Sequence, residues 1–272
     1  IIIIWVYQWI YQIVIKEKEN MDLENIFDKI NIIPGDKILV HSNILKILIK
    51  LKKKNKKFNA NLIIDSLINK VGPNGTIIFA AYNFEFCNGK AFDYNKSQSM
   101  VGSMGNFALE RKDFRRTKNP IYSFAVTGKD KDYLCNLNHN NCFDLDSPFG
   151  YLIKNHAKML FIDMDYKDGF TLCHVAEQAV GVNYRILKNF SGSYIDKFKN
   201  KSKVNCRMFV RNLNSNVART MIDKKMDKIL IKKQAYEKKI VGGIILNLID
   251  MNKAYKIMKH DLQNKGGLVY TI

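Results

Sequence analysis

The chain alternates segments of helical spacing with short runs of consecutive apolar residues, and this alternation constrains the fold more than any other feature. Short apolar runs bounded by turns are typical of strands buried on both faces. Such runs occupy residues 37–40, 76–81, 123–127 and 158–162. Apolar residues recur at helical spacing in residues 22–31, 61–71 and 171–180. The alternation predicts an α/β domain with helices on both faces of a central sheet.

Glycine and proline mark the boundaries of these segments. Pro34, Gly35 and Asp36 form a turn signal directly before the first apolar run. Residues 72–75 (GPNG) end one helical segment and begin the next strand, and Gly181 follows the segment 171–180 as a helix C-terminal glycine would.

The last third of the chain has a different pattern. Residues 206–213 alternate apolar and polar side chains, which is typical of a half-exposed strand. We expect a helix over residues 216–230, a strand-rich turn region over 239–248 and a final helix over 251–264. These additions predict a mixed central β-sheet rather than a purely parallel one.

The first twenty residues do not match the rest of the chain. They contain a 15-residue apolar run followed by KEKEN, which is shorter than the roughly 20 residues of a comfortable membrane span. A basic start and a small-residue cleavage site, which a signal peptide needs, are both missing. We expect residues 1–20 to be an extension outside the fold, with no stable membrane insertion, and residues 21–272 to form one domain. An interfacial anchor helix is the alternative for residues 1–20.

The formal net charge of +19 is the unusual bulk property. It favours polyanionic partners, or it reflects compositional drift on solvated faces. No aromatic-basic signature and no finger spacing of Cys and His accompanies it, so a nucleic-acid partner is not expected. Five scattered cysteines without CxxC pairs indicate a reducing cytoplasm, no disulfide framework and no zinc site.

The first segment that could carry chemistry is His41, Ser42 and Asn43, at the end of the strand 37–40. Ser and Asn are good helix N-caps, and a helix-like run follows from Ile44. A helix N-terminus offers free N–H groups to a phosphate. The segment is therefore either a pyrophosphate cradle or an ordinary capped turn between strand and helix.

A second segment places Thr171, His174, Glu177 and Gln178 on one side of the helix expected over 171–180. Glu177 can reach His174, orient its imidazole and stabilise its protonated form, which suits a general base near neutral pH. The alternative is a solvent-exposed face that happens to hold a His–Glu pair. Two ligands without a third do not indicate a metal site.

A third segment contains Gly102 and Ser103 and leads to Arg115 and Arg116. Glycine allows close backbone approach, and an arginine pair can bind phosphates in bidentate fashion. Glycine-rich loops and arginine pairs are also common without any ligand.

In order along the chain, these segments resemble the aminoglycoside 3-N-acetyltransferase family, whose fold differs from the GNAT fold. The family's opening VHSS element is matched by residues 35–43, with Asn43 in place of the second Ser. Its VGxxGT, RSxHPxHS and SPxG elements resemble residues 71–78, 116–123 and 146–150. Its TxxHxxE helix with a following VxYR is matched by residues 171–185. The resemblance covers nearly all of residues 21–272.

The resemblance implies direct acetyl transfer from acetyl-coenzyme A to an amine in a ternary complex, without a metal. His174 would take a proton from the amine, Glu177 would hold and charge-compensate the imidazole, and Thr171 is a candidate donor to the tetrahedral oxyanion. The residues expected to contact coenzyme A are His41, Ser42, Asn43, Gly102, Ser103, Arg115 and Arg116.

The chain departs from the family pattern where Asn119 and Tyr122 replace the two histidines of HPxHS. The stretch 206–213 also resembles the branch found among polysaccharide-biosynthesis enzymes. A basic chain attracts a nucleotide-linked amino sugar more than a polycationic aminoglycoside, so we expect an amino-sugar acceptor, with an aminoglycoside as the alternative. A basic polyanion-binding protein without catalysis is the alternative from another class. We expect a monomer or homodimer.

Overall fold

The computed structural model describes residues 22–215, 219–220, 222–264 and 266–271. Its helices are α2 (Leu45–Lys53), α3 (Ala60–Val71), α4 (Met104–Leu109), α5 (Lys131–Asn136), α6 (Pro148–Lys154), α7 (Leu172–Val180), α8 (Lys225–Lys232) and α9 (Met251–Gln263), with 3-10 turns η1 (Glu85–Asn88) and η2 (Tyr166–Asp168). Its strands are β1 (Lys37–Ser42), β2 (Thr76–Ala80), β3 (Phe92–Asp93), β4 (Arg115–Arg116), β5 (Phe124–Gly128), β6 (Lys158–Ile162), β7 (Arg185–Ile195), β8 (Lys201–Arg211), β9 (Arg219–Thr220), β10 (Tyr236–Val241), β11 (Ile244–Asp250) and β12 (Tyr270–Thr271).

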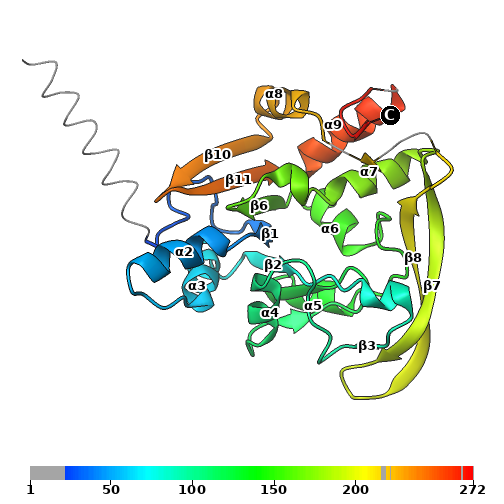
Figure 1. Cartoon of the computed structure of the whole chain (residues 1–272), viewed down its shortest axis with the longest axis horizontal. Helices are drawn as coiled ribbons and strands as arrows, with labels where there is room; N and C mark the ends of the chain where they lie inside the picture. The colour runs from blue at the N-terminus through cyan, green and yellow to red at the C-terminus, as the bar shows by residue number, and fades with distance from the viewer. Residues whose placement is uncertain (1–21, 216–218, 221, 265, 272) are drawn as a thin grey trace, which may run out of the picture.

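The central sheet is mixed, as the sequence predicts. In the described part of the chain it has seven strands in the order β10-β11-β6-β1-β2-β5-β4 (Figure 1). Strands β6, β1 and β2 are parallel to one another, whereas β11, β10, β5 and β4 join by antiparallel pairing. The carboxyl ends of the three parallel strands therefore meet at one edge of the sheet.

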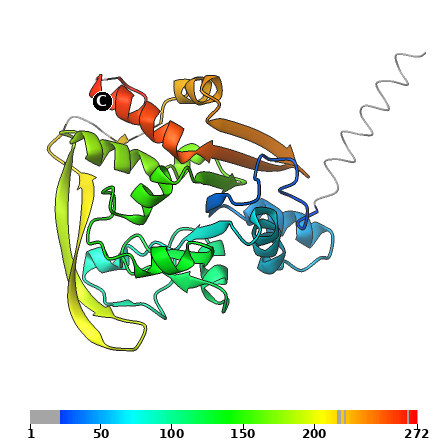
Figure 2. The same cartoon turned by 180° about the vertical axis from the view of Figure 1, so that it is seen from behind.

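Strand β1 is buried on both faces because its alternate side chains enter two different cores. Leu39 packs in a core that includes side chains of α6, α7 and α9. Ile38 and Val40 pack in a second core that includes side chains of α2, α3 and α4. Helices therefore cover both faces of the sheet (Figures 1 and 2), which confirms the predicted α/β architecture.

A long hairpin of β7 and β8 lies beside the central sheet and pairs with β3. The strand expected over 206–213 is part of β8, which begins earlier, at Lys201. Strand β7 was not predicted, because its sequence RILKNFSGSYI has no regular alternation and most of its residues are exposed or half-buried.

Two predicted helices differ from the structure. Residues 22–31 form turns instead of a helix, although Leu23, Ile26, Phe27 and Ile30 are all buried as the helical spacing requires. The helix expected over 216–230 begins only at Lys225, because Asp223 accepts the backbone N–H of Lys225 and β9 pairs with β12 before it.

The region 239–248 contains the β10–β11 hairpin, which turns at Gly242 and Gly243 with φ values of 54° and 73°. The final helix is α9, as predicted. None of the helices in the described ranges has the length and apolar composition needed to cross a bilayer. The expectations for residues 1–20 lie outside the described residues.

Candidate active site

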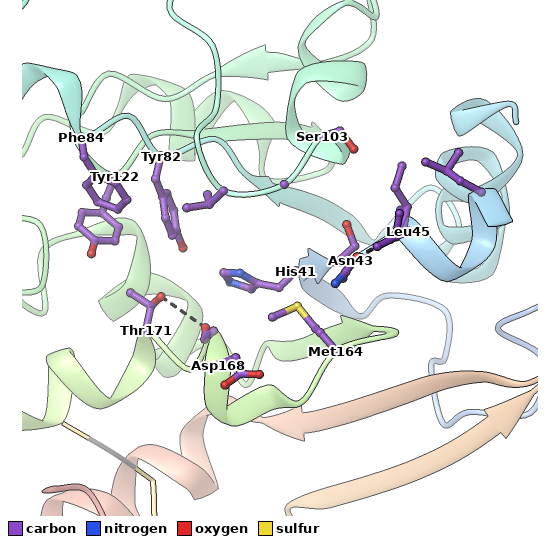
Figure 3. Close-up of a pocket in the computed structure, with 16 residues that line it drawn as sticks. His41, Asn43, Leu45, Tyr82, Phe84, Ser103, Tyr122, Met164, Asp168 and Thr171 are labelled. Atoms are coloured by element: carbon purple, nitrogen blue, oxygen red, sulfur yellow. Dashed lines mark hydrogen bonds between the residues drawn. The ribbon is translucent and has the colours of Figure 1, made fainter. Parts of the chain in front are cut away.

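A pocket of about 590 Å³ opens at the carboxyl edge of the parallel strands (Figure 3). Segments that follow β1, β2 and β6 supply its walls, as ligand sites in open α/β sheets commonly require. The lining residues are His41, Ser42, Asn43, Ile44, Leu45, Leu48, Tyr82, Phe84, Val101, Gly102, Ser103, Tyr122, Met164, Asp168, Gly169 and Thr171. The pocket thus brings together His41, Ser42, Asn43, Gly102, Ser103 and Thr171, six of the residues selected from the sequence.

His41 points from β1 into the face of the sheet that carries α7. Its ring stacks on Phe161 at a centroid distance of 5.4 Å and meets Tyr82 edge-on at 6.0 Å. The residue is 8% exposed, and burial lowers the pKa of the imidazole to about 4. The ring is therefore neutral at pH 7.

Because the His41 imidazole is buried in its neutral form, we expect the free energy of unfolding to fall in acid. An unfolded histidine with a pKa near 6.5 binds a proton as the pH falls below that value, whereas the folded ring resists protonation down to about pH 4. Replacing His41 with Phe removes this linkage, so the variant should gain stability relative to the parent between pH 6.5 and pH 4, by about 3 kcal/mol in total. Urea unfolding across this range measures the difference; parallel pH profiles for parent and variant would contradict it.

The loop before α4 and the first turn of α4 pack closely on the ends of β1 and β2. A Cβ atom at Gly102, where φ is +86°, would lie 3.1 Å from the carbonyl oxygen of Ser42. A Cβ atom at Gly105 would lie 2.2 Å from the carbonyl oxygen of Ala80. Glycine is thus required at both positions for the loop to reach the pocket, which explains the pattern VGSMG in this segment.

Helix α7 begins at the inner end of the pocket. Thr171 precedes it, and Gly181 ends it in the left-handed conformation with φ 72°, so its predicted boundaries are confirmed. The backbone N–H of His174 donates to the carbonyl oxygen of Thr171 at 3.0 Å. Thr171 lines the pocket, and His174 follows one turn later along the same helix.

His174 and Glu177 form a close pair. Nδ1 of His174 lies 2.7 Å from Oε2 of Glu177. The Glu177 side chain has no exposed surface, whereas that of His174 is 22% exposed. Arg185 Nε lies 2.6 Å from the same Oε2, and the Tyr184 hydroxyl donates to Oε1 at 3.1 Å. The His174–Glu177 pair is therefore part of a network around a buried carboxylate, and its imidazole is partly exposed. It is not a pair on a fully solvated helix face.

This network orients the imidazole. With Nδ1 directed at the carboxylate, Nε2 is the nitrogen left to accept a proton from a substrate. A positive charge that forms on the ring lies beside a buried negative charge. His174 also packs on Phe143, with ring centroids 5.3 Å apart.

Cys173, His174 and Glu177 could in principle ligate a cation, since their ligand atoms lie within 4.8 Å of one another. However, Arg185 and Tyr184 already hold both carboxylate oxygens of Glu177. Burial also raises the pKa of the Cys173 thiol well above its ordinary value, which opposes the thiolate that a metal requires. The donor set fits an ion-pair network better than a metal site.

Arg115 and Arg116 are not brought to this pocket. They form β4 and line a second pocket of about 340 Å³ that shares no lining residue with the first. Arg115 pairs with Asp132 at 2.8 Å. Arg116 is 3% exposed, and its guanidinium lies over the Phe92 ring at 5.2 Å.

Asn119 and Tyr122, the two departures from the family pattern, differ in their relation to the pocket, since only Tyr122 lines it. Asn119 is buried and accepts the backbone N–H groups of Ile121 and Tyr122, so it holds its own loop together. Tyr122 lines the pocket and packs on Tyr82 and Phe143 with centroid distances of 4.5 and 4.7 Å.

Sequence reasoning missed several residues of the site. Tyr82, Phe84, Met164 and Asp168 line the pocket without belonging to any motif. Their only signal is position, since each follows a strand of the parallel set. Arg185 is different, because it belongs to the VxYR element and only its contact with Glu177 was not foreseen.

A family model for aminoglycoside 3-N-acetyltransferase matches residues 39–263, which span the pocket, α7 and most of the sheet. The chain belongs to the aminoglycoside 3-N-acetyltransferase family. Membership confirms the expectation of an acyltransferase. No curated protein sequence matches the chain significantly.

Several solved structures share the fold, and aminoglycoside acetyltransferases are among them. The AAC-IIIb binary complex with CoASH superposes with a TM-score of 0.73 at 17% identity, covering 90% of this chain and 96% of that one. Sisomicin-bound AAC-VIa gives 0.73 at 19% identity, with coverages of 90% and 97%. The YokD protein from Bacillus subtilis gives 0.70 at 17% identity, with coverages of 89% and 97%.

Proposed function

We propose that this family member transfers the acetyl group of acetyl-coenzyme A to the amine of an amino sugar, with His174 as general base. The observation that carries the proposal is the 2.7 Å contact between His174 Nδ1 and the fully buried Glu177 carboxylate, one helical turn from a pocket that Thr171 lines.

The residues have defined tasks in this reaction. An amine is mostly protonated at neutral pH and attacks the thioester carbon only in its neutral form. His174 accepts the amine proton as the C–N bond forms, and Glu177 compensates the imidazolium charge. The C–S bond then breaks, and the proton passes to the departing thiolate, leaving an amide and a free thiol. General-base catalysis contributes about 10²–10⁴-fold, and alignment of the two substrates adds to it.

The pocket at the carboxyl edge of the sheet suits the pantetheine arm of coenzyme A. It lies beside the N-terminal end of α2, and Ser42, Gly102 and Ser103 offer polar and backbone groups along one wall. The solved AAC-IIIb complex contains CoASH, which supports coenzyme A as the ligand of this fold. We assign the pocket to acetyl-coenzyme A. Arg115 and Arg116 do not line it and so are not among the contacts that we assign to the pocket.

The net charge of +19 supports an anionic acceptor such as a nucleotide-linked amino sugar of surface-polysaccharide synthesis. An aminoglycoside is the second candidate, and it is supported by the sisomicin found in the solved AAC-VIa structure. The same net charge is the only support for a noncatalytic polyanion-binding role. The proposal also includes one domain over residues 21–272, a monomer or homodimer, and a cytoplasmic location that agrees with five free thiols.

Thiol release from acetyl-coenzyme A, measured against a panel of acceptors, tests the proposal. We expect release that depends on an added amine and is faster with nucleotide-linked amino sugars than with kanamycin- or gentamicin-type compounds. Faster thiol release with aminoglycosides than with nucleotide-linked amino sugars would instead assign an aminoglycoside as the acceptor. Thiol release without any amine would indicate a thioester hydrolase, and salt-sensitive polyanion binding without thiol release would favour the noncatalytic role.

A further inference from the structure

His41 is part of the pocket wall, and its polar ring has no hydrogen-bond partner among the described residues. No hydrogen bond joins its ring to another residue in the described ranges, and Nε2 is buried without one. Its neighbours are the Phe161 and Tyr82 rings, which hold the imidazole in place by stacking and edge contact. An unsatisfied buried polar atom costs about 1–3 kcal/mol, so a polar side chain held in this way calls for an explanation beyond packing.

The surroundings of the ring decide which nitrogen carries the hydrogen. A hydrogen on Nε2 would be buried without an acceptor, whereas Nδ1 lies beside Gly169, another residue of the pocket wall. A Cβ atom at Gly169 would lie 3.7 Å from Nδ1 and 3.0 Å from the Met164 methyl. Glycine therefore leaves open the space over Nδ1. Because Nε2 is buried without an acceptor, we assign the N–H of the neutral ring to Nδ1, on the side of Gly169.

We propose that His41 is a second catalytic imidazole, which donates a hydrogen bond from Nδ1 to the thioester carbonyl oxygen and to the oxyanion that forms from it. The inference rests on the proposed acetyl-transfer function. His41, Tyr82 and Thr171 point toward one another in Figure 3, and Thr171 connects this part of the pocket to His174 through the first turn of α7.

His41 suits this task better than the threonine considered from the sequence. The Thr171 hydroxyl is directed to the carbonyl oxygen of Gly169 at 3.4 Å, so its hydrogen is already engaged. Burial keeps the pKa of His41 at about 4, so at pH 7 the ring is neutral and offers one N–H as a donor. A neutral imidazole can polarise a carbonyl in this way, and a preorganised donor to an oxyanion acts without reorganisation during the reaction.

The test compares kcat and KM of His41→Phe with the parent enzyme in the thiol-release assay. Phe keeps an aromatic ring beside Phe161 and removes both ring nitrogens. Loss of one oxyanion donor predicts a fall in kcat of about 10²–10³-fold with KM for acetyl-coenzyme A nearly unchanged. His41→Asn, whose amide lies near the position of Nδ1, should recover at least part of the loss. His260→Gln, at an exposed histidine of α9, is the matched control.

A second variant tests the same role without changing His41, in case His41→Phe does not fold. Gly169→Ala leaves His41 in place but fills the space over Nδ1, and the backbone at Gly169 does not have a positive φ. It should lower kcat at an unchanged melting temperature, whereas Gly267→Ala, whose added Cβ meets no atom within 4 Å, should not. Near-parental kcat in His41→Phe and Gly169→Ala, or a loss confined to KM, overturns the proposal. A parent enzyme without amine-dependent thiol release instead refutes the proposed function.

Discussion

Replacing His174 with Ala should lower the rate of amine-dependent thiol release by about 10²–10⁴-fold, because the variant has no group that accepts the proton of the attacking amine. Binding of coenzyme A should persist, since His174 does not line the pocket at the end of the parallel strands. Folding should persist as well, because the imidazole is partly exposed and Glu177 keeps its contacts with Arg185 and Tyr184. Steady-state kinetics and a thermal melt with added CoASH measure the three quantities.

Added imidazole provides a sharper version of this test. The His174 side chain is 22% exposed, so truncation opens a space that solvent imidazole can enter beside Glu177. Imidazole should restore part of the rate in His174→Ala and leave His260→Ala, at an exposed histidine of α9, unaffected. Turnover in His174→Ala at the parental rate would remove His174 from the mechanism.

The parts of the site that lie within single motifs were predictable from the sequence. Helix α7 has a regular apolar side, a glycine at its end and a His–Glu pair at the (i, i+3) spacing that brings side chains together. The strand β1 is a continuous apolar run that ends in His41 and Ser42. Local periodicity and turn chemistry decide such segments, and they carry the resemblance that identified the family.

The parts that depend on long-range packing were not predictable. Arg115 and Arg116 follow the Gly102 loop in sequence, but β4 pairs with β5 as the edge strand of the sheet and places both residues in a separate pocket. The buried Glu177 carboxylate contacts Arg185 at the start of β7. The irregular pattern of that strand gave no sign of this contact. Residues 22–31 show the same limit, since their apolar spacing fits buried turns as well as a helix.

The second large effect is expected at Glu177. The substitution Glu177→Gln keeps the side-chain shape but removes the negative charge that faces both His174 and Arg185. It should lower kcat by a factor comparable to the loss of His174, because the imidazolium formed in the reaction loses its counter-charge. It should also cost about 3–5 kcal/mol of stability, since the Arg185 guanidinium, with a side chain 11% exposed, loses its carboxylate partner. Urea unfolding and steady-state kinetics measure the two losses independently.

The double variant Glu177→Gln with Arg185→Met separates the two roles of the carboxylate. Removing both charges also removes the buried guanidinium that has lost its carboxylate partner, so most of the lost stability should return, as replacement of a buried ion pair by apolar groups commonly allows. The rate should stay low, because an amide still stands where His174 needs a negative charge. Recovery of kcat together with stability would mean that Glu177 acts only by holding the fold, and Glu177 would then have no direct part in proton transfer.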